Sequence, residues 1–151
     1  MIEKLKESKR PKHSKRPVLF WIDDNRSLRR IARLIFANSD FKCVTARSGS
    51  EGIRMLDKVN PDLILLDIEM PRINGFETCN QIQAFHKESG CKTPPILMVS
   101  SHKNIGHLNR AFDLGIIDIV PKPINWKLLV NRIRYILNTN NDSETQNLAV
   151  N

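Results

Sequence analysis

The chain has 151 residues, of which 40% are hydrophobic and 26% are charged, and its formal net charge at pH 7 is +8. This length suits one globular domain with a real hydrophobic core. The apolar stretches are far shorter than a membrane span, and the charged N-terminus lacks the apolar segment of a secretory signal, so we expect a soluble cytoplasmic protein.

The positive charge is concentrated near the N-terminus. Residues 1–17 contain seven basic and two acidic residues and therefore carry +5, which leaves +3 for the rest of the chain. The segment has no aromatic residue and no helical apolar face, so we expect a disordered, solvated extension. Contact with nucleic acid or an anionic surface through these basic residues is the alternative interpretation. At the other end, residues 139–151 are polar, and we expect a frayed tail.

Strand and helix patterns alternate five times between the two tails. Short apolar runs predict five strands, at about 18–22, 42–46, 63–66, 96–99 and 116–120. Segments with helical patterns follow them, around 28–35, from 51 to the Asn60-Pro61 break, at 76–85, at 104–114 and after Asn125. Ser48 and Glu51 form a plausible capping box before the second helix. In the fifth helix, Leu129, Ile133 and Ile136 are expected to face inward.

Alternation of this kind predicts an α/β fold with a parallel sheet. Right-handed crossovers place helices on both faces of such a sheet. Pro121 has no amide donor, so the fifth strand fits this arrangement only at an edge of the sheet. Ligands of open parallel sheets bind beyond the carboxyl ends of the strands, and the residues that follow the predicted strands are therefore candidates for a site.

Acidic side chains close two of the predicted strands. Asp67 follows the buried run 63–66, and Asp23-Asp24 follow the apolar run 18–22. If these two strands are parallel neighbours, the three carboxylates converge at one edge of the sheet. Oxygen ligands without a nearby His or Cys cluster suit a hard cation, magnesium above all.

Two further polar residues are expected at the same edge, because Ser100 follows the fourth strand and Lys122 the fifth. Phosphoryl transfer requires an in-line nucleophile, a cation and stabilisation of the charge on the equatorial oxygens. Asp67 is the candidate carboxylate nucleophile. Lys122 can bring a positive charge to a phosphate oxygen, and the Ser100 hydroxyl can donate to the phosphoryl group.

The motifs that carry these residues occur in a familiar order: Asp23-Asp24, Asp67 with Met70-Pro71 and Gly75, Val99-Ser100-Ser101, and Lys122-Pro123. Over about residues 18–138 the chain resembles the receiver domain of two-component response regulators. The resemblance implies a flavodoxin-like, doubly wound five-stranded sheet of order 2-1-3-4-5. It implies that Asp67 accepts a phosphoryl group from a histidine kinase or phosphotransfer protein. It also implies that the backbone carbonyl of Glu69 is a magnesium ligand and that the Lys122-Pro123 peptide is cis.

The resemblance further implies a phosphorylation-controlled switch and not a conventional enzyme. Ser100 and Ile119 occupy the switch positions, and Ile119 replaces the Tyr or Phe that the family often has there, so we expect a muted switch. Output is expected through the surface formed by the helix at 104–114, the strand at 116–120 and the helix after Asn125. The partner is an unknown output protein, and a homodimer through this surface is left open.

Four other functions are conceivable for a chain with this pattern. A pseudo-receiver that binds partners without phosphate is opposed by the intact acids, Ser100 and Lys122. The segments 122–126 and 132–135 are similar to receivers that precede diguanylate cyclase modules, so a regulatory fragment of such a protein is an alternative. A phosphohydrolase of the haloacid-dehalogenase type would need an Asp where Glu69 stands. The absence of a Gly-rich loop after the first predicted strand excludes a dinucleotide-binding domain.

Overall fold

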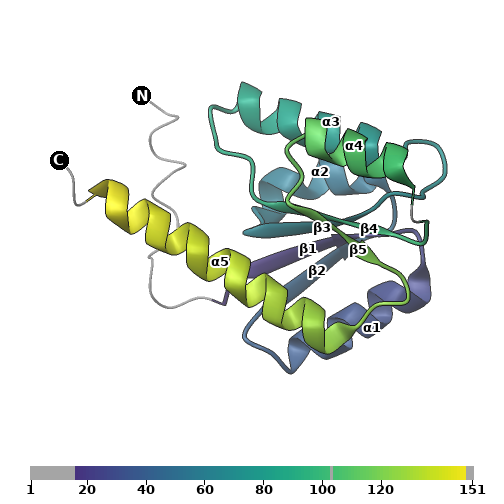
Figure 1. Ribbon diagram of the computed structural model, residues 1–151, viewed down its shortest axis with the longest axis horizontal. Helices are drawn as coiled ribbons and strands as arrows, with labels where there is room; N and C mark the ends of the chain where they lie inside the picture. Colours follow the sequence, from purple (N-terminus) through teal and green to yellow (C-terminus); the bar gives the residue numbers. More distant parts are fainter. Residues whose placement is uncertain (1–15, 103, 149–151) are drawn as a thin grey trace.

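Five strands and five helices alternate along the residues that the computed structural model describes, 16–102 and 104–148. The elements are β1 (Val18–Ile22), α1 (Arg26–Ala37), β2 (Lys42–Ala46), α2 (Gly49–Val59), β3 (Leu63–Asp67), α3 (Gly75–Glu88), β4 (Ile96–Ser100), α4 (Ile105–Asp113), β5 (Asp118–Pro121) and α5 (Trp126–Leu148). The strands are parallel and lie in the order β2-β1-β3-β4-β5 (Figure 1). The predicted flavodoxin-like fold is therefore confirmed.

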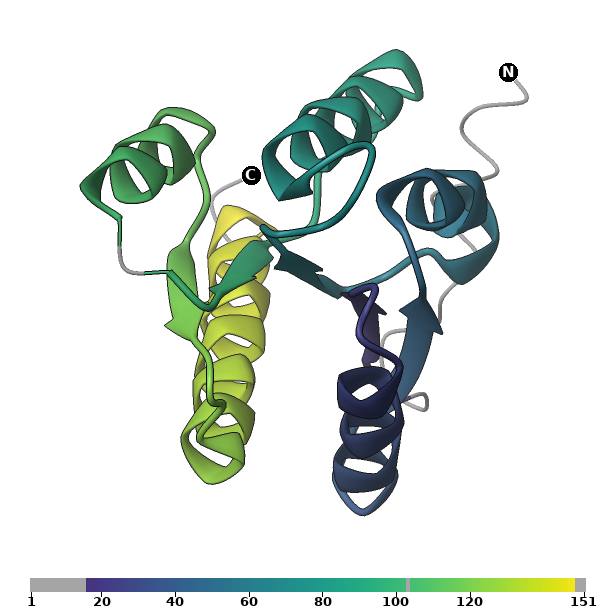
Figure 2. The same ribbon diagram turned by 90° about the vertical axis from the view of Figure 1, so that its right-hand side faces the viewer.

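The helices cover both faces of the sheet, with α1 and α5 on one side and α2, α3 and α4 on the other (Figures 1 and 2). The strands supply apolar side chains to both layers because successive residues of a strand point to opposite faces. In β1, Leu19 and Trp21 pack in the cluster with α1 and α5, whereas Phe20 and Ile22 pack in the other cluster. The two cores therefore share one sheet.

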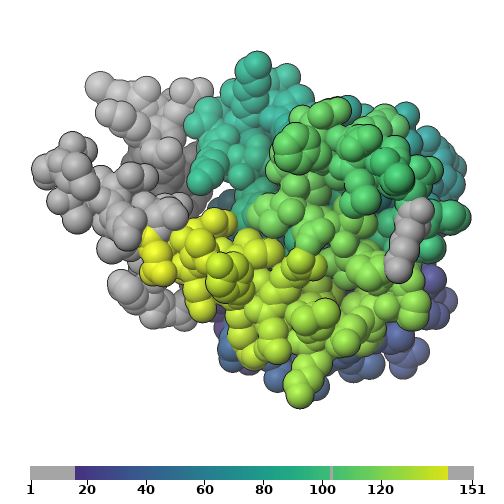
Figure 3. Space-filling model, in the orientation of Figure 1, coloured from purple at the N-terminus to yellow at the C-terminus, as the bar shows by residue number. Residues whose placement is uncertain are grey.

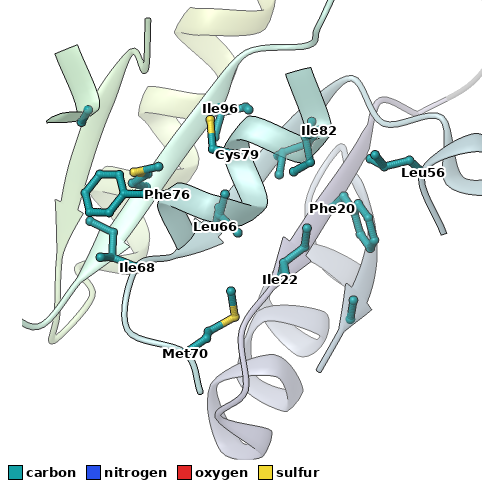
Figure 4. Packing of buried hydrophobic residues seen from close by; sticks show 14 residues of the cluster. Phe20, Ile22, Leu56, Leu66, Ile68, Met70, Phe76, Cys79, Ile82 and Ile96 are labelled. Atoms are coloured by element: carbon teal, nitrogen blue, oxygen red, sulfur yellow. The ribbon is translucent and has the colours of Figure 1, made fainter. Parts of the chain in front are cut away.

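In the cluster beneath α2, α3 and α4, side chains of α3 pack on those of the strands (Figure 4). Phe76, Cys79 and Ile82 of this helix are buried against Leu66 of β3 and Ile96 of β4. Their spacing of three residues places them on one side of the helix, which is the pattern of an amphipathic helix on a sheet. This packing fixes where α3 begins, directly after the loop that leaves β3.

The second cluster contains a group of packed aromatic rings. The Trp21 ring centroid lies 6.4 Å from that of Phe36 in α1 and 5.5 Å from that of Trp126 in α5. Leu129, Ile133 and Ile136 of α5 are buried as predicted. The arrangement joins the last turn of α1 and the first turn of α5 to β1.

Several local predictions need correction. The helical spacing of the apolar residues 28, 31, 32 and 35 predicted the inward face of α1, but Ile31 is 39% exposed, and Ala32 and Phe36 are the buried residues of the helix. Ser48 accepts a hydrogen bond from the Glu51 amide, but the Glu51 carboxylate bonds the Arg47 amide, so the capping box at α2 is only half formed. A complete capping box starts α3 instead, between Asn74 and Glu77. These outcomes depend on packing and local geometry that residue type alone does not specify.

The fifth strand and fifth helix also differ from the predicted bounds. β5 starts at Asp118, after the 116–117 segment, and lies at an edge of the sheet, which accommodates Pro121 as expected. α5 continues to Leu148, past the boundary predicted at residue 138. Extending an existing helix costs far less than nucleating one, so a packed first half can carry polar residues in helical form. The predicted extension 1–17 lies, except for residues 16 and 17, outside the described residues.

The part of the chain that the structure describes contains no helix that is long and apolar enough to cross a bilayer.

Candidate functional site

The three acids converge at the carboxyl edge of the sheet, as predicted. Ile22 and Leu66 are partners across β1 and β3, so the residues that follow them, Asp23 and Asp67, lie side by side. Asp24 completes the group: each of the three carboxylates offers an oxygen, and these oxygens lie within 4.8 Å of one another. Parallel pairing of β1 and β3 is therefore what assembles the cluster.

The start of α1 holds the acidic loop in place. Asn25 is the N-cap of α1, and its backbone amide donates to Asp23 Oδ1 at 2.8 Å. The Arg29 guanidinium donates to the backbone carbonyl oxygens of Asp23 and Asp24 at 2.9 and 3.0 Å. Neither Asn25 nor Arg29 was among the residues predicted for the site, although Asn before a helical pattern is a known cap signal. Asn25 thus holds the carboxylate of Asp23, and Arg29 holds the backbone of both acids.

Lys122 reaches into the acidic cluster from the end of β5. Its Nζ lies 3.2 Å from Asp67 Oδ1 and 3.5 Å from Asp23 Oδ2, and its side chain is 18% exposed. Burial alone would lower the pKa of Lys122, but the charges of Asp23 and Asp67 outweigh it and raise this pKa. The Lys122–Pro123 peptide is cis, as the resemblance implied. Lys122 therefore remains a cation beside the two buried carboxylates.

The pKa of the Asp67 carboxyl group lies well above its ordinary value. Burial and the neighbouring charge of Asp23 raise its pKa to about 8, although Lys122 acts in the opposite direction. Its Oδ1 accepts from both Lys122 Nζ and the backbone amide of Glu69, the latter at 3.3 Å. The site thus has more negative charge than Lys122 alone can compensate.

The residues present fit a hard divalent cation. Asp23 is fully buried, and its Oδ2 has no hydrogen-bond partner within the described residues; Lys122 Nζ approaches it only as an ion-pair contact. Three carboxylates with one ammonium group leave a net negative site whose donors are all oxygen atoms. Such a donor set suits magnesium or a similar cation and could bind it.

Ser100 and Glu69 meet across the edge formed by β3 and β4. Ser100 is buried, and its Oγ donates to Glu69 Oε1. Burial alone would raise the pKa of Glu69, but hydrogen bonds from Ser100, the Ser101 amide and His102 outweigh it and hold this pKa below its ordinary value. The sequence analysis considered only the backbone carbonyl of Glu69 as a ligand, and it did not select His102 for the site. No local signal predicts a bond between residues 31 positions apart.

Gly75 lies directly against the end of β3, whereas Ile119 packs in the core. Gly75 starts α3, and its amide donates to the Ile68 carbonyl at 2.9 Å, directly beyond Asp67. A β-carbon at Gly75 would lie 2.4 Å from the Asp67 carbonyl oxygen, so only glycine allows this close approach. Ile119 of β5 is half-buried and packs against the cluster beneath α4. Its role as a switch residue stays a prediction.

Comparison with known proteins identifies the class of domain that this fold and site define. Residues 19–134 match the family of the response regulator receiver domain. The chain therefore belongs to the response regulator receiver family, and it is a phospho-accepting receiver of the two-component type, a signalling switch.

Curated relatives are regulators of transcription. The chain is 31% identical over 121 residues to the transcriptional regulatory protein AfsQ1 of Streptomyces coelicolor, covering 80% of this chain and 51% of that protein. It is 32% identical over 125 residues to the transcriptional regulatory protein CpxR of Klebsiella pneumoniae, covering 83% and 51%. The chain thus spans about half the length of the curated relatives that it matches.

Solved structures show the same fold. The chemotaxis protein CheY4 of Vibrio cholerae superposes with a TM-score of 0.71 at 24% identity, covering 80% of this chain and 98% of that one. A CheY-like receiver domain protein of Methanospirillum hungatei gives 0.77 at 18% identity, covering 86% and 99%. At these identities the likeness concerns the fold alone.

Proposed function

We propose that Asp67 is the phosphoacceptor of this receiver and that a histidine kinase or phosphotransfer protein is the donor. The observation that carries the proposal is the position of Asp67 at the carboxyl end of β3, beside Asp23 and within 3.2 Å of Lys122 Nζ. A buried carboxylate between a second acid and a fixed ammonium group is arranged for chemistry on an anionic group.

The transfer follows from the chemistry of these groups. A carboxylate oxygen of Asp67 forms a bond to the phosphorus while the bond from phosphorus to the donor nitrogen breaks, and the donor imidazole leaves with the bonding electron pair. Lys122 stabilises the negative charge on one phosphoryl oxygen, and the Ser100 hydroxyl donates a hydrogen bond to another. Lys122 already contacts Asp67, with its Nζ 3.2 Å from Oδ1.

Magnesium would be held by Asp23, Asp24, Asp67 and the backbone carbonyl of Glu69. When bound, the ion would neutralise the charge that the carboxylates and the phosphoryl group share. The fully buried Asp23 with its unbonded Oδ2 supports this assignment. Asn25 and Arg29 would keep the acids oriented for it.

Output would pass through the face formed by α4, β5 and α5, which adjoin one another (Figure 3). On α4, the apolar side chains of Ile105, Leu108 and Phe112 are exposed at a spacing of three and four residues. Apolar side chains on one exposed side of a helix are typical of a contact surface. An output protein or a second copy of this chain would bind there, and Ser100 and Ile119 would transmit the change.

The protein itself would act as a cytoplasmic switch without turnover of an external substrate. The receiver would comprise about residues 18–138, with a basic segment before it and a polar segment after it. Contact with nucleic acid would be limited to that basic segment. The position of Lys122 between two acids argues against a pseudo-receiver.

A mass measurement tests the assignment of Asp67. We expect acetyl phosphate with magnesium to add one phosphoryl group to the wild-type chain and none to Asp67→Asn, since the amide is not a competent nucleophile. Asp57→Asn, which changes an exposed acid of α2, should load like the wild type. Loading of Asp67→Asn to the wild-type extent would contradict the proposal.

Magnesium binding should depend on Asp24. Because Asp24 is exposed, its replacement by alanine should leave the fold intact while it removes one charge and one oxygen ligand. We expect Asp24→Ala to bind magnesium at least roughly tenfold more weakly than the wild type, as measured by calorimetry. Asp57→Ala should bind it as the wild type does. Equal affinities in all three proteins would count against the acidic cluster as the metal site.

A further inference from the structure

The carboxylate of Glu69 accepts hydrogen bonds from the end of β4 and from the loop that follows it. Ser100 Oγ donates to its Oε1, and the Ser101 amide donates to its Oε2 at 3.3 Å. The His102 ring Nδ1 lies 3.2 Å from Oε1. Three consecutive residues thus bind the two oxygens of one side chain, which comes from the loop after β3.

The hydroxyl proton of Ser100 cannot serve two acceptors. A serine hydroxyl carries a single donor proton, whereas its oxygen can accept from elsewhere. The His102 amide donates to this oxygen at 3.1 Å. That bond does not use the hydroxyl proton, which can be donated to one acceptor. The His102 carbonyl also lies 3.1 Å away, but the charged carboxylate of Glu69 is the stronger acceptor. In this conformation the Ser100 hydroxyl therefore donates its hydrogen bond to Glu69.

The Ser100 hydroxyl is also the group that we assign to a phosphoryl oxygen of phosphorylated Asp67. Both acceptors are anionic, and each would bring more than one oxygen to the same loop. They cannot occupy the donor together, and two anions at one place also repel each other. Phosphate can therefore use Ser100 only after the Glu69 carboxylate has left it.

We infer that Glu69 is a built-in competitor of the phosphoryl group, which holds Ser100 and the Ser101 amide before phosphorylation and must release them for the switch to operate. The inference rests on the proposed role of Asp67 as phosphoacceptor. Glu69 acts here as a positioning residue, because it sets where the loop and its donors lie. The gain from binding phosphate is reduced by the loss of the Glu69 contacts, which opposes premature switching.

Beryllofluoride with saturating magnesium probes this competition on the full chain. We expect Glu69→Ala to bind the probe roughly tenfold more tightly than the wild type, the change that corresponds to losing one charge-assisted contact. Glu69→Gln should show a smaller gain, because its amide carbonyl can still accept from Ser100 without the charge. The backbone carbonyl of Glu69 is present in both variants, so the proposed metal ligands are unchanged.

Two measurements separate competition from a structural defect. Glu88→Gln changes an exposed glutamate at the end of α3 and should bind beryllofluoride like the wild type. In amide spectra without the probe, Glu69→Ala should move the Ser101 signal, whereas Glu88→Gln should not. Damage to the site would weaken binding, whereas removal of a competitor strengthens it.

The outcomes distinguish this inference from the proposed function. If the wild type binds beryllofluoride and accepts phosphate on Asp67, but both Glu69 variants bind the probe equally well or more weakly, the competition is overturned and the phosphoacceptor stands. If neither the wild type nor any variant binds the probe or gains a phosphoryl group, the phosphoacceptor proposal is overturned and this inference with it.

Discussion

Replacing Gly75 by alanine is expected to destabilise the domain by about 3 kcal/mol, because the added methyl group has no room to move into. A β-carbon at this position would lie 2.4 Å from the Asp67 carbonyl oxygen and 2.7 Å from the Ile68 α-carbon, both backbone atoms. Neither can rotate away, so β3 and α3 must separate. The melting temperature should fall by roughly 10 °C for a domain of this size, as measured by calorimetry or circular dichroism.

Gly106→Ala is the matched control for this variant. Gly106 lies in the first turn of α4, and a β-carbon there would meet only the side chain of Asn104, at 3.1 Å. Alanine also favours the helix over glycine, so the change in stability should stay within about 1 kcal/mol. A melting temperature for Gly75→Ala equal to that of Gly106→Ala would show that the contact with the end of β3 is not rigid.

The metal-free protein should lose stability as the pH rises from about 4 to about 8, and Asp67→Asn should remove this loss. The pKa of Asp67 is raised to about 8 by burial and by Asp23, whereas its ordinary value is 3.8. An acid whose pKa is higher in the folded chain contributes stability that is full below the unfolded pKa and is lost as the pH rises through the folded pKa. Between these two pKa values the unfolded chain has released the Asp67 proton and the folded chain still holds it, so the free energy of unfolding falls as the pH rises.

Urea unfolding in EDTA at several pH values measures this effect. At pH 9 we expect Asp67→Asn to be more stable than the wild type by on the order of 2 kcal/mol, after a discount for screening by Lys122 and water. The difference should shrink toward about pH 4, where the unfolded chain also begins to hold the Asp67 proton. Asp57→Asn should track the wild type at every pH. A difference between wild type and Asp67→Asn that does not vary with pH would contradict the raised pKa.

The fold could be predicted from the sequence because its signals are local. Apolar runs of strand length, each followed by a helical pattern, imply crossovers and hence a parallel sheet, whichever residues fill the core. The same logic placed Asp23, Asp67 and Lys122 at one edge, since the carboxyl ends of parallel strands lie together. Residue type and position along the chain were enough for these conclusions.

The detailed contacts of the site required the tertiary structure. Whether Lys122 bonds Asp67 or Asp23 depends on distances of 3.2 and 3.5 Å that no sequence pattern encodes. The bond between Glu69 and Ser100 joins the loop after β3 to the last residue of β4, and it depends on the pairing of β3 with β4. Such contacts depend on strand register, on the path of each loop and on side-chain torsions.

The chain's own pattern of apolar and acidic residues thus determined the sheet, the strand ends and the identity of the acids. Only the tertiary structure decided that Ile31 faces outward, that α5 continues to Leu148 and that Gly75 touches the end of β3. The physical reason is the range of the interactions. Periodicity and turn preference act over a few residues, whereas burial, close approach and hydrogen bonding between loops arise only when distant segments pack together.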